Sequence, residues 1–337
     1  MFRFIIRRLL WTIPVLLVVL VVTFLLMHAV PFGPWDKDPE RMAMKQLTMD
    51  ESTREMLDRS FGLDKPMWRQ FTMYVVGDWN EQGRFVCGLV CGNLGPSFSQ
   101  RGRTVQEILF GAPEGRSFWQ SRFGYSVRLA LFALVFAIGS GIPLGVIAAL
   151  KQNTWIDHLL TVLETLCISV PNFVIGLLLI VLVVISETKL ITIAPRSWTG
   201  SETWVIPVVI LGLSTMASAA RLTRTSVLEV MRHDYIRTAR AKGLSERAVI
   251  GEHILKNALI PVITLLGPSL AEMIAGSAVI EMMFGFPGMG SIYISSIKNL
   301  DYSMILGVTV MYATLVTLGN LFVDLAYGYL DPRVQVE

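Results

Sequence analysis

The feature that most constrains this chain is a series of six apolar stretches, each close to the length that crosses a lipid bilayer. A helix needs roughly 20 mostly apolar residues to span a hydrocarbon core about 30 Å thick. Because a helix satisfies its own backbone hydrogen bonds, it can exist in lipid without other partners. We therefore predict an all-α membrane protein with six transmembrane helices, at residues 9–30, 125–150, 159–185, 204–220, 259–283 and 302–327.

The composition agrees with a membrane protein. Hydrophobic residues make up 53% of the chain, charged residues 16%, and the mean hydropathy is +0.56. The first stretch follows Arg3, Arg7 and Arg8 and could be taken for a secretory signal peptide. It is too long for the apolar core of a signal peptide, and "LLMHAVPFGP" offers no convincing cleavage site, so we expect a span.

The short loops divide into a basic set and a weakly charged set. Cytoplasmic loops carry an excess of Lys and Arg, which places both termini in the cytoplasm. The expected parts are a first span within residues 1–30, an extracytoplasmic domain at 31–122, a core of five spans at 123–328 with a cytoplasmic loop at 221–258, and a tail at 329–337. The basic set is Arg3, Arg7, Arg8, Lys151, Arg221, Arg224, Arg232, Arg237, Arg240, Lys242, Arg247, Lys256 and Arg333, and the other set is Lys189, Arg196 and Lys298.

The cytoplasmic segment 234–262, "DYIRTARAKGLSERAVIGEHILKNALIPV", has the pattern of a basic helix in two pieces. Gly243 fits a helix stop because glycine adopts a left-handed backbone easily. Ser245 is a good N-cap for a second helix, in which Val249 and Ile254 recur at helical spacing. Small residues among cations suit docking on an acidic protein surface. The alternative is a basic helix lying on anionic lipid, although the apolar face of the first piece is narrow.

Several motifs in order resemble one family, the permeases of ABC importers. The run "ARAKGLSERAVIGEHILKNALIPV" is similar to the cytoplasmic coupling motif of that family, in the form found in the first permease subunit of dipeptide and oligopeptide importers. Nearly the whole chain takes part in the resemblance, including "MFRFIIRRLLWTIPVLLVVLVVTFLLMHAVPFGP", "FGLDKPMWRQF", "GNLGPSFSQRGRTVQEI", "EMMFGFPGMGSIYISSIKNLDYSMILG" and "NLFVDLAYGYLDPRV".

The resemblance implies the type I ABC importer permease fold and transport of di- or oligopeptides by alternating access. It implies a second permease subunit, two cytoplasmic ATPase subunits, an extracytoplasmic solute-binding protein and surrounding lipid as partners, with no nucleic acid. The coupling segment would dock on the ATPase subunits. The residues expected at this contact are Arg237, Ala239, Arg240, Ala241, Lys242, Gly243 and Leu244. The usual Glu-Ala-Ala of the wider family is incomplete here, with Thr238 in place of the Glu.

We expect no catalytic residues, metal or cofactor on this chain, so ATP and Mg²⁺ would bind the partner ATPase subunits. No G-x-x-x-x-G-K-[ST] phosphate loop is present. "GSGIPLG" places Gly141 and Gly145 four residues apart inside a span, which favours close helix packing. Cys87 and Cys91 leave three interpretations open, a disulfide, two free thiols or a metal site. We favour free thiols, because four-residue spacing on a helix suits a disulfide poorly.

Acidic residues inside spans are rare, so each one is a candidate functional residue. Glu272 lies near the middle of the fifth stretch and Glu164 lies inside the third. We hypothesise that Glu272 faces the translocation path and attracts a cationic group of the cargo. The alternative is an ion pair with the partner permease. Glu164, nearer the cytoplasm, is the weaker candidate for the path. Glu281 and Asp324 match the family's own pattern, which implies a structural role.

Other functions stay open from the sequence. The same machinery could import an oligosaccharide, glutathione or nickel, because the cargo of such importers is chosen largely by the binding protein. A different class would be an ATP-independent secondary transporter or channel, which would favour an inverted repeat that we do not see. A membrane-embedded enzyme would need clustered acids, bases or metal ligands. The four histidines are scattered along the chain instead.

Overall fold

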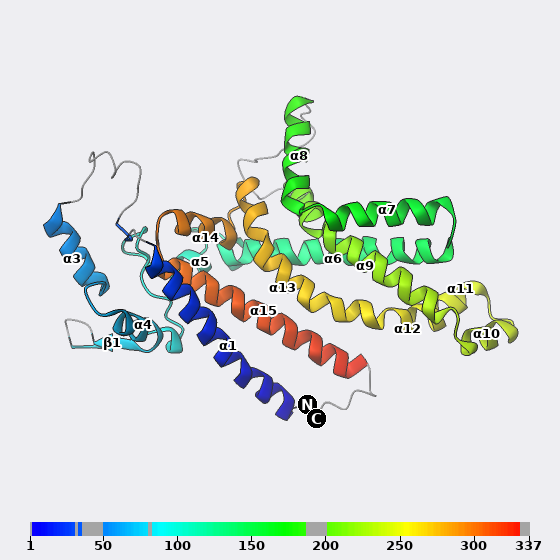
Figure 1. Cartoon of the computed structure of the whole chain (residues 1–337), viewed down its shortest axis with the longest axis horizontal. Coiled ribbons are helices and arrows are strands. Elements are labelled where there is room, and N and C mark those ends of the chain that lie inside the picture. The colour runs from blue at the N-terminus through cyan, green and yellow to red at the C-terminus, as the bar shows by residue number, and fades with distance from the viewer. Residues whose placement is uncertain (1, 31–32, 36–49, 80–82, 187–200, 331–337) are drawn as a thin grey trace. The chain divides into compact units, whose positions relative to one another are not determined.

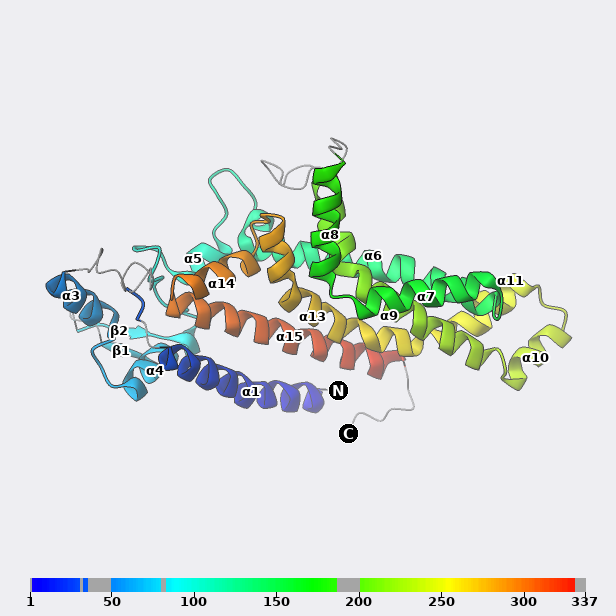
Figure 2. The ribbon, with the colours of Figure 1, turned by 45° about the horizontal axis from the view of Figure 1, so that its top comes forward.

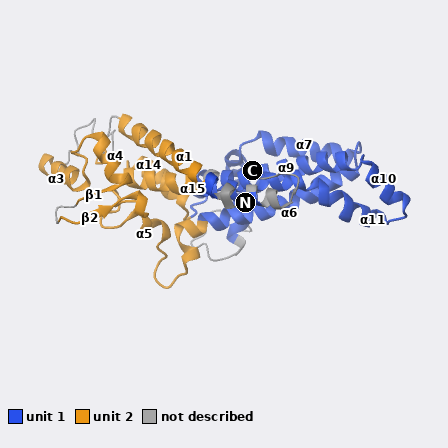
Figure 3. Ribbon diagram, turned by 90° about the horizontal axis from the view of Figure 1, so that it is seen from below, with its two compact units in different colours: residues 1–8, 126–286, 315–337 blue, residues 9–125, 287–314 orange. Residues whose placement is uncertain are grey.

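The computed structural model describes residues 2–30, 33–35, 50–79, 83–186 and 201–330, and these residues are mainly helical (Figure 1). They fall into two compact units (Figure 3). Unit 1 contains residues 1–8, 126–286 and 315–337, and unit 2 contains residues 9–125 and 287–314. The predicted positions of Lys189, Arg196 and Arg333 lie outside the described residues.

Unit 1 is built mainly from long apolar helices. Its longest helices are α6 (Arg122–Leu150) and α9 (Val205–Val230), and α13 (Ile260–Met283) packs against α9. Between α9 and α13 the chain forms a series of short helical pieces at one end of the unit (Figures 1 and 2). The remaining elements of this region are α7 (Trp155–Ser169), α8 (Asn172–Ile185), η3 (Ser201–Trp204), α10 (Asp234–Ala241), α11 (Glu246–Ala248), η4 (Val249–Leu255) and α12 (Lys256–Ala258).

Among the described residues, four helices are long and apolar enough to cross a membrane alone. They are residues 6–29 of α1 (Phe2–Ala29), α6, α9 and residues 302–322 of α15 (Tyr302–Leu330). Two bent pairs, α7 with α8 and residues 246–258 with 260–274, bring the number to six if each pair counts as one span.

The third predicted span, residues 159–185, is divided into the two helices α7 and α8. The chain turns by 100° between α7 and α8, as the two helices show in Figure 1. Val170, which precedes Pro171, has extended backbone, because a proline disfavours helical geometry in the residue before it. With 15 and 14 residues, the two pieces are each shorter than the roughly 20 residues of a full crossing.

The contact between α6 and α9 depends on small residues. A side-chain Cβ on Gly145 would lie 2.3 Å from the Ala220 carbonyl oxygen, and one on Gly141 would lie 2.6 Å from that of Met216. The two glycines therefore let the backbones of α6 and α9 approach each other, as their spacing predicts. The packing interpretation of "GSGIPLG" is confirmed.

A buried ion pair joins α7 to α9. Arg224 donates from Nε to Asp157 Oδ1 at 2.6 Å and from Nη2 to Asp157 Oδ2 at 2.8 Å. The Asp157 side chain is 2% exposed. Two parallel hydrogen bonds of this kind fix both separation and orientation of the two side chains. The pair therefore holds the first turns of α7 against α9.

Unit 2 combines residues 9–29 of α1 with small elements that follow it in the chain. Two short helices of this unit are α3 (Glu51–Phe61) and α4 (Met67–Val75). A two-stranded antiparallel sheet pairs Gly77 with Cys87 and Trp79 with Phe85. The other elements are β1 (Gly77–Trp79), β2 (Phe85–Cys87), η1 (Leu89–Cys91), α5 (Val105–Phe110), η2 (Phe118–Gln120), α14 (Met289–Lys298) and the first part of α15.

An apolar core holds unit 2 together across segments far apart in sequence. Phe24 and Met27 of α1 pack in one buried cluster with Trp35, Phe98 and Tyr302. The carboxylate of Asp301 lies beside this core and is 0% exposed. Because its acceptor oxygens bind the loop at residues 97–99, Asp301 ties that loop to the start of α15.

Cys87 and Cys91 form a disulfide, with their Cα atoms 5.9 Å apart. Our preference for two free thiols is therefore wrong. It assumed that both residues share one helix, whereas Cys87 ends strand β2 and Cys91 ends the short helix η1. The backbone at Gly88, with φ −89° and ψ −146°, turns the chain between them, and the Cα atoms reach the usual disulfide separation.

Candidate functional site

The segment between α9 and α13 begins with α10. His233 precedes this helix with extended backbone, and the helix ends at Ala241. Gly243 follows at φ 79°, in the left-handed region, and its N–H donates to the Arg240 carbonyl at 2.9 Å. The predicted helix stop at Gly243 is therefore present. Apart from Gly243 and its two chain neighbours, no heavy atom of the described residues lies within 4 Å of the position that a Cβ on Gly243 would occupy, so this turn faces open space.

One face of α10 is buried. Ile236 is 0% exposed and Ala239 is 6% exposed. Both pack in a core with Val227 and Val230 of α9 and with Val249. Ala239 thus lies on the buried side of α10, where its small side chain lets the helix pack closely on the end of α9.

The opposite face of α10 and the turn after it are exposed. Arg240 donates from Nη2 to Glu246 Oε1 at 2.6 Å and from Nε to Glu246 Oε2 at 3.2 Å. This fork bridges the turn at Gly243 and connects α10 to α11. The predicted docking residues that lie on this exposed surface are Arg237, Arg240, Ala241, Lys242, Gly243 and Leu244.

The second helical piece is less regular than its pattern predicts. Ser245 caps it as expected, accepting a hydrogen bond from the Ala248 N–H at 3.4 Å. Residues Val249–Leu255 then form a π-helix instead of an α-helix. Long π-turns are uncommon and often occur at functional sites. Here the wider turn still buries Val249 and Ile254, each 0% exposed, under α10.

Glu272 lies at a small cavity within unit 1. The cavity has a volume of about 200 Å³ and also touches Asn172, Ser214 and Thr215. Asn172 donates from Nδ2 to Ser214 Oγ at 3.1 Å, while its Oδ1 has no hydrogen-bond partner among the described residues. The bend before α8 brings Asn172 to this cavity, and the apolar pattern of this stretch does not mark Asn172 as a site residue.

Glu164 lies elsewhere and does not line this cavity. It sits on α7, 6% exposed, and its Oε1 has no hydrogen-bond partner among the described residues. The structure therefore does not bring the two predicted path residues together. Glu281 is 0% exposed and accepts hydrogen bonds from Ser126 Oγ at 2.6 Å and Ser277 Oγ at 2.9 Å, joining α6 to α13. The Asp324 side chain lies outside the described residues.

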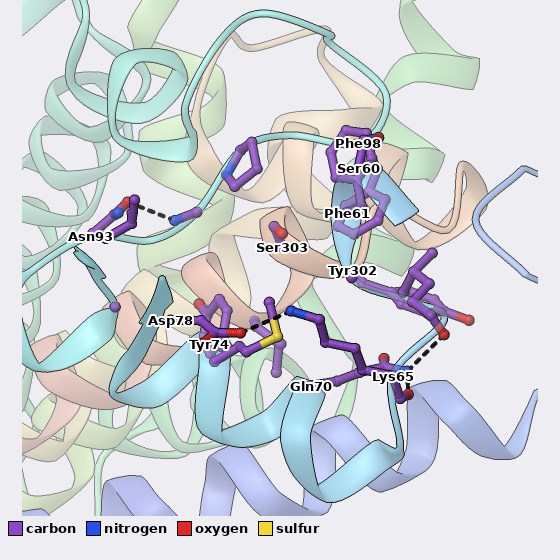
Figure 4. A pocket seen from close by; sticks show the side chains of 18 of the residues that line it. Ser60, Phe61, Lys65, Gln70, Tyr74, Asp78, Asn93, Phe98, Tyr302 and Ser303 are labelled. Atoms are coloured by element: carbon purple, nitrogen blue, oxygen red, sulfur yellow. Dashed lines mark hydrogen bonds and ion pairs between the residues drawn. The ribbon is translucent and has the colours of Figure 1, made fainter. Parts of the chain in front are cut away.

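Unit 2 contains a larger cavity of about 470 Å³ (Figure 4). Aromatic rings of Phe61, Phe98 and Tyr302 form part of its wall. Lys65 donates from Nζ to Asp78 Oδ2 at 2.8 Å along the lining, which holds the pKa of Asp78 below its usual range. The cavity was not predicted, because its walls come from α1, α3, α4, the β-hairpin and α15 and no single motif marks them.

The chain matches two models of one family of transport proteins. The model of the binding-protein-dependent transport system inner membrane component matches residues 141–336. The model of the N-terminal part of such membrane components matches residues 1–118. Because the first match alone covers more than half of the chain, the chain belongs to the family of binding-protein-dependent transport permeases.

Relatives match over the full length. The dipeptide transport system permease protein of Bacillus subtilis is 36% identical over 336 residues, which cover 100% of this chain and 99% of the relative. The oligopeptide transport system permease protein of Escherichia coli K12 is 33% identical over 337 residues, covering 99% and 100%. A glutathione transport system permease protein of Escherichia coli O6:H1 is also 33% identical, over 335 residues, covering 99% of each.

A solved structure shares the fold. A chain of the inward-facing methionine ABC transporter MetNI aligns with a TM-score of 0.50 and 18% identity, covering 61% of this chain and 93% of that one. The predicted class, a helical membrane protein of the type I ABC importer permease fold, is confirmed. The chain is a permease subunit of an ABC transporter and a multi-pass protein of the inner membrane.

Proposed function

We propose that this chain is the first permease subunit of an importer that moves di- or oligopeptides across the cytoplasmic membrane by alternating access. The observation that carries the proposal is similarity along the whole chain, 36% identity over 336 residues, to a dipeptide transport system permease protein. The partners would be a second permease subunit, two cytoplasmic ATPase subunits and an extracytoplasmic solute-binding protein.

The coupling step is proposed for the exposed surface of the α10 turn. This surface combines cationic Arg237 and Lys242 with the open turn at Gly243. Its buried side packs on the end of α9, so a force on the turn acts on a helix of the membrane core. ATP and Mg²⁺ would bind the ATPase subunits, and ATP-driven closure of those subunits would move α10 and, through it, α9.

Co-purification tests the coupling surface. In membranes from cells that express the complete transporter, a tagged wild-type chain should recover the ATPase subunits and the second permease. Gly243→Asp adds a negative charge to the turn, and we expect it to lose the ATPase subunits while keeping the second permease. Gly251→Asp is the matched control, because Gly251 also has no atom within 4 Å of its Cβ position but lies outside the turn.

The outcomes separate the parts of the proposal. If wild type purifies alone and still transports, the importer proposal fails. If both glycine variants lose the ATPase subunits equally, the turn at Gly243 is not the specific contact. The cargo is tested separately by uptake of labelled dipeptide, oligopeptide, oligosaccharide, glutathione and nickel in cells with and without the chain. Uptake of glutathione, oligosaccharide or nickel without peptide would contradict the peptide assignment.

A further inference from the structure

Helix α4 of unit 2 has one exposed side. Trp68 and Thr72 of α4 and Val76, which directly follows the helix with helical backbone, come at intervals of four residues and so share one side. Trp68 is 69% exposed and Val76 is 53% exposed. Thr72 is also exposed, but its hydroxyl donates to the Arg69 carbonyl at 2.9 Å within the helix. We call these three residues the outer face of α4.

The opposite side of α4 fixes its position beside α1. The ring of Phe71 lies 5.4 Å from that of Phe24. Gln70 Oε1 lies 3.1 Å from His28 Nε2. Phe24 and His28 belong to the last two turns of α1, which ends at Ala29. Helix α4 therefore lies alongside this end of α1, as Figures 1 and 2 show, and Figure 4 shows it crossing next to α1.

The length of α1 sets the depth of α4 in the membrane. Its candidate span is 24 residues, or about 36 Å at 1.5 Å per residue. This is about 6 Å more than a hydrocarbon core about 30 Å thick, so the last turn of α1 can reach the headgroup region. Phe24 lies about 7 Å before the end of the helix, close to the boundary between headgroups and acyl chains. The contacts with Phe24 and His28 place α4 at that boundary.

The side chains of α4 match the chemistry of this boundary. Trp is enriched where headgroups meet acyl chains, because its ring is apolar and its N–H is polar. At the same depth, Leu25 and Leu26 of α1 are 54% and 65% exposed, so the apolar surface of the span reaches the level of α4. Arg69 follows Trp68 in the chain, and its side chain is 50% exposed while its Nη2 lies 3.7 Å from Asp78 Oδ2. A partly exposed cation at this depth can approach lipid phosphates.

We propose that the outer face of α4 is buried among lipid headgroups at the Ala29 end of α1 and anchors unit 2 to the membrane surface. A soluble binding protein would meet unit 2 on its aqueous side, beyond the headgroups. The contacts of Phe71 and Gln70 hold α4 beside the last turns of α1, so lipid is the occupant that fits an exposed Trp68 at this depth. This inference does not depend on the cargo or on the coupling segment.

Tryptophan quenching by brominated lipid tests the anchor. The full-length chain is placed in nanodiscs that contain lipid brominated either near the headgroup end or near the methyl end of the acyl chain. The difference between wild type and Trp68→Phe isolates the signal of Trp68 from the other seven of the eight tryptophans. We expect bromine near the headgroup end to quench the Trp68 fluorescence more strongly than bromine near the methyl end. Trp204→Phe is the control, because Trp204 is 8% exposed and packs on Phe286.

A second variant protects the test against misfolding of the first. Val76→Trp, in the Trp68→Phe background, places a new tryptophan on the same face, and we expect it to restore the quenched signal. If bromine at neither depth quenches Trp68, or if only methyl-end bromine does, the proposal is overturned. It is also overturned if brominated lipid leaves the Trp68 fluorescence unchanged while addition of a soluble binding protein changes it.

Discussion

At the residue scale, Asp301 shows how one buried carboxylate can organise a loop. Its oxygens accept hydrogen bonds from Ser97 Oγ at 2.5 Å, Phe98 N at 3.1 Å, Ser99 N at 3.0 Å, Ser99 Oγ at 2.8 Å and Met304 N at 3.2 Å. Hydrogen bonds to an ionised group are stronger than those between neutral groups. The carboxylate thus satisfies donors from the loop and from the first turn of α15 together.

Replacing Asp301 should therefore destabilise unit 2. Asp301→Ala leaves several buried donors without an acceptor, and each bond to a charged group contributes roughly 1.5–3 kcal/mol. Because such losses do not add fully, we expect a decrease of about 3 kcal/mol or more in folding free energy. Thermal unfolding of the purified chain in detergent measures this. Asp64→Ala, at an exposed position of the same unit, is the control. Equal Tm values for the two variants would contradict the assigned role.

Glu272 carries a prediction about cargo charge. Its position at the cavity beside Asn172 is consistent with a path residue, but a partner permease could also supply an ion pair there. If Glu272 attracts cationic cargo, Glu272→Gln should reduce uptake of a cationic peptide more than uptake of a neutral one. Competition uptake in cells measures the ratio. Equal loss for both peptides, or no loss, would exclude charge selection, and Glu164→Gln is the comparison at a residue away from the cavity.

At the element scale, the close contact of α6 with α9 should be sensitive to side-chain size. Gly145→Val would press a branched side chain against the Ala220 carbonyl, which lies 2.3 Å from the Cβ position. The two helices would have to separate, so we expect loss of folded protein. Gly139→Val, on the same helix with nothing within 4 Å of its Cβ position, should be tolerated. The fraction of protein that elutes as a single species in detergent measures the difference. Similar elution of both variants would refute the close-contact explanation.

At the scale of the whole molecule, the charge distribution makes a prediction about orientation. The excess of Lys and Arg in one set of short loops predicts that the α10 turn lies in the cytoplasm and the domain at residues 31–122 outside. A Lys242→Cys variant and an Asp64→Cys variant, each in a Cys167→Ala background, give one reactive thiol, because Cys87 and Cys91 are paired. In intact spheroplasts, an impermeant maleimide should label position 64 and reach position 242 only after permeabilisation. The reverse pattern would invert the topology.

The sequence by itself determined the features that depend on neighbouring residues. Apolar length predicts the helices that cross the membrane, because burial in lipid needs only a continuous run. The stop at Gly243 and the cap at Ser245 follow from local backbone preferences. The spacing of Gly141 and Gly145 predicts close helix packing for the same reason, since four residues separate positions on one helix face.

Only the tertiary structure decided features that join distant segments. The bend at Pro171 brings Asn172 to the cavity of Glu272, and the burial of Ala239 depends on α9 and the π-turn. The pairing of Cys87 with Cys91 depends on a strand end and a short helix that the four-residue spacing does not specify. The partners of Asp301 lie about 200 positions earlier in the chain. Sequence patterns report local preferences, whereas these contacts arise from the packing of the folded chain, which selects among many possible pairings.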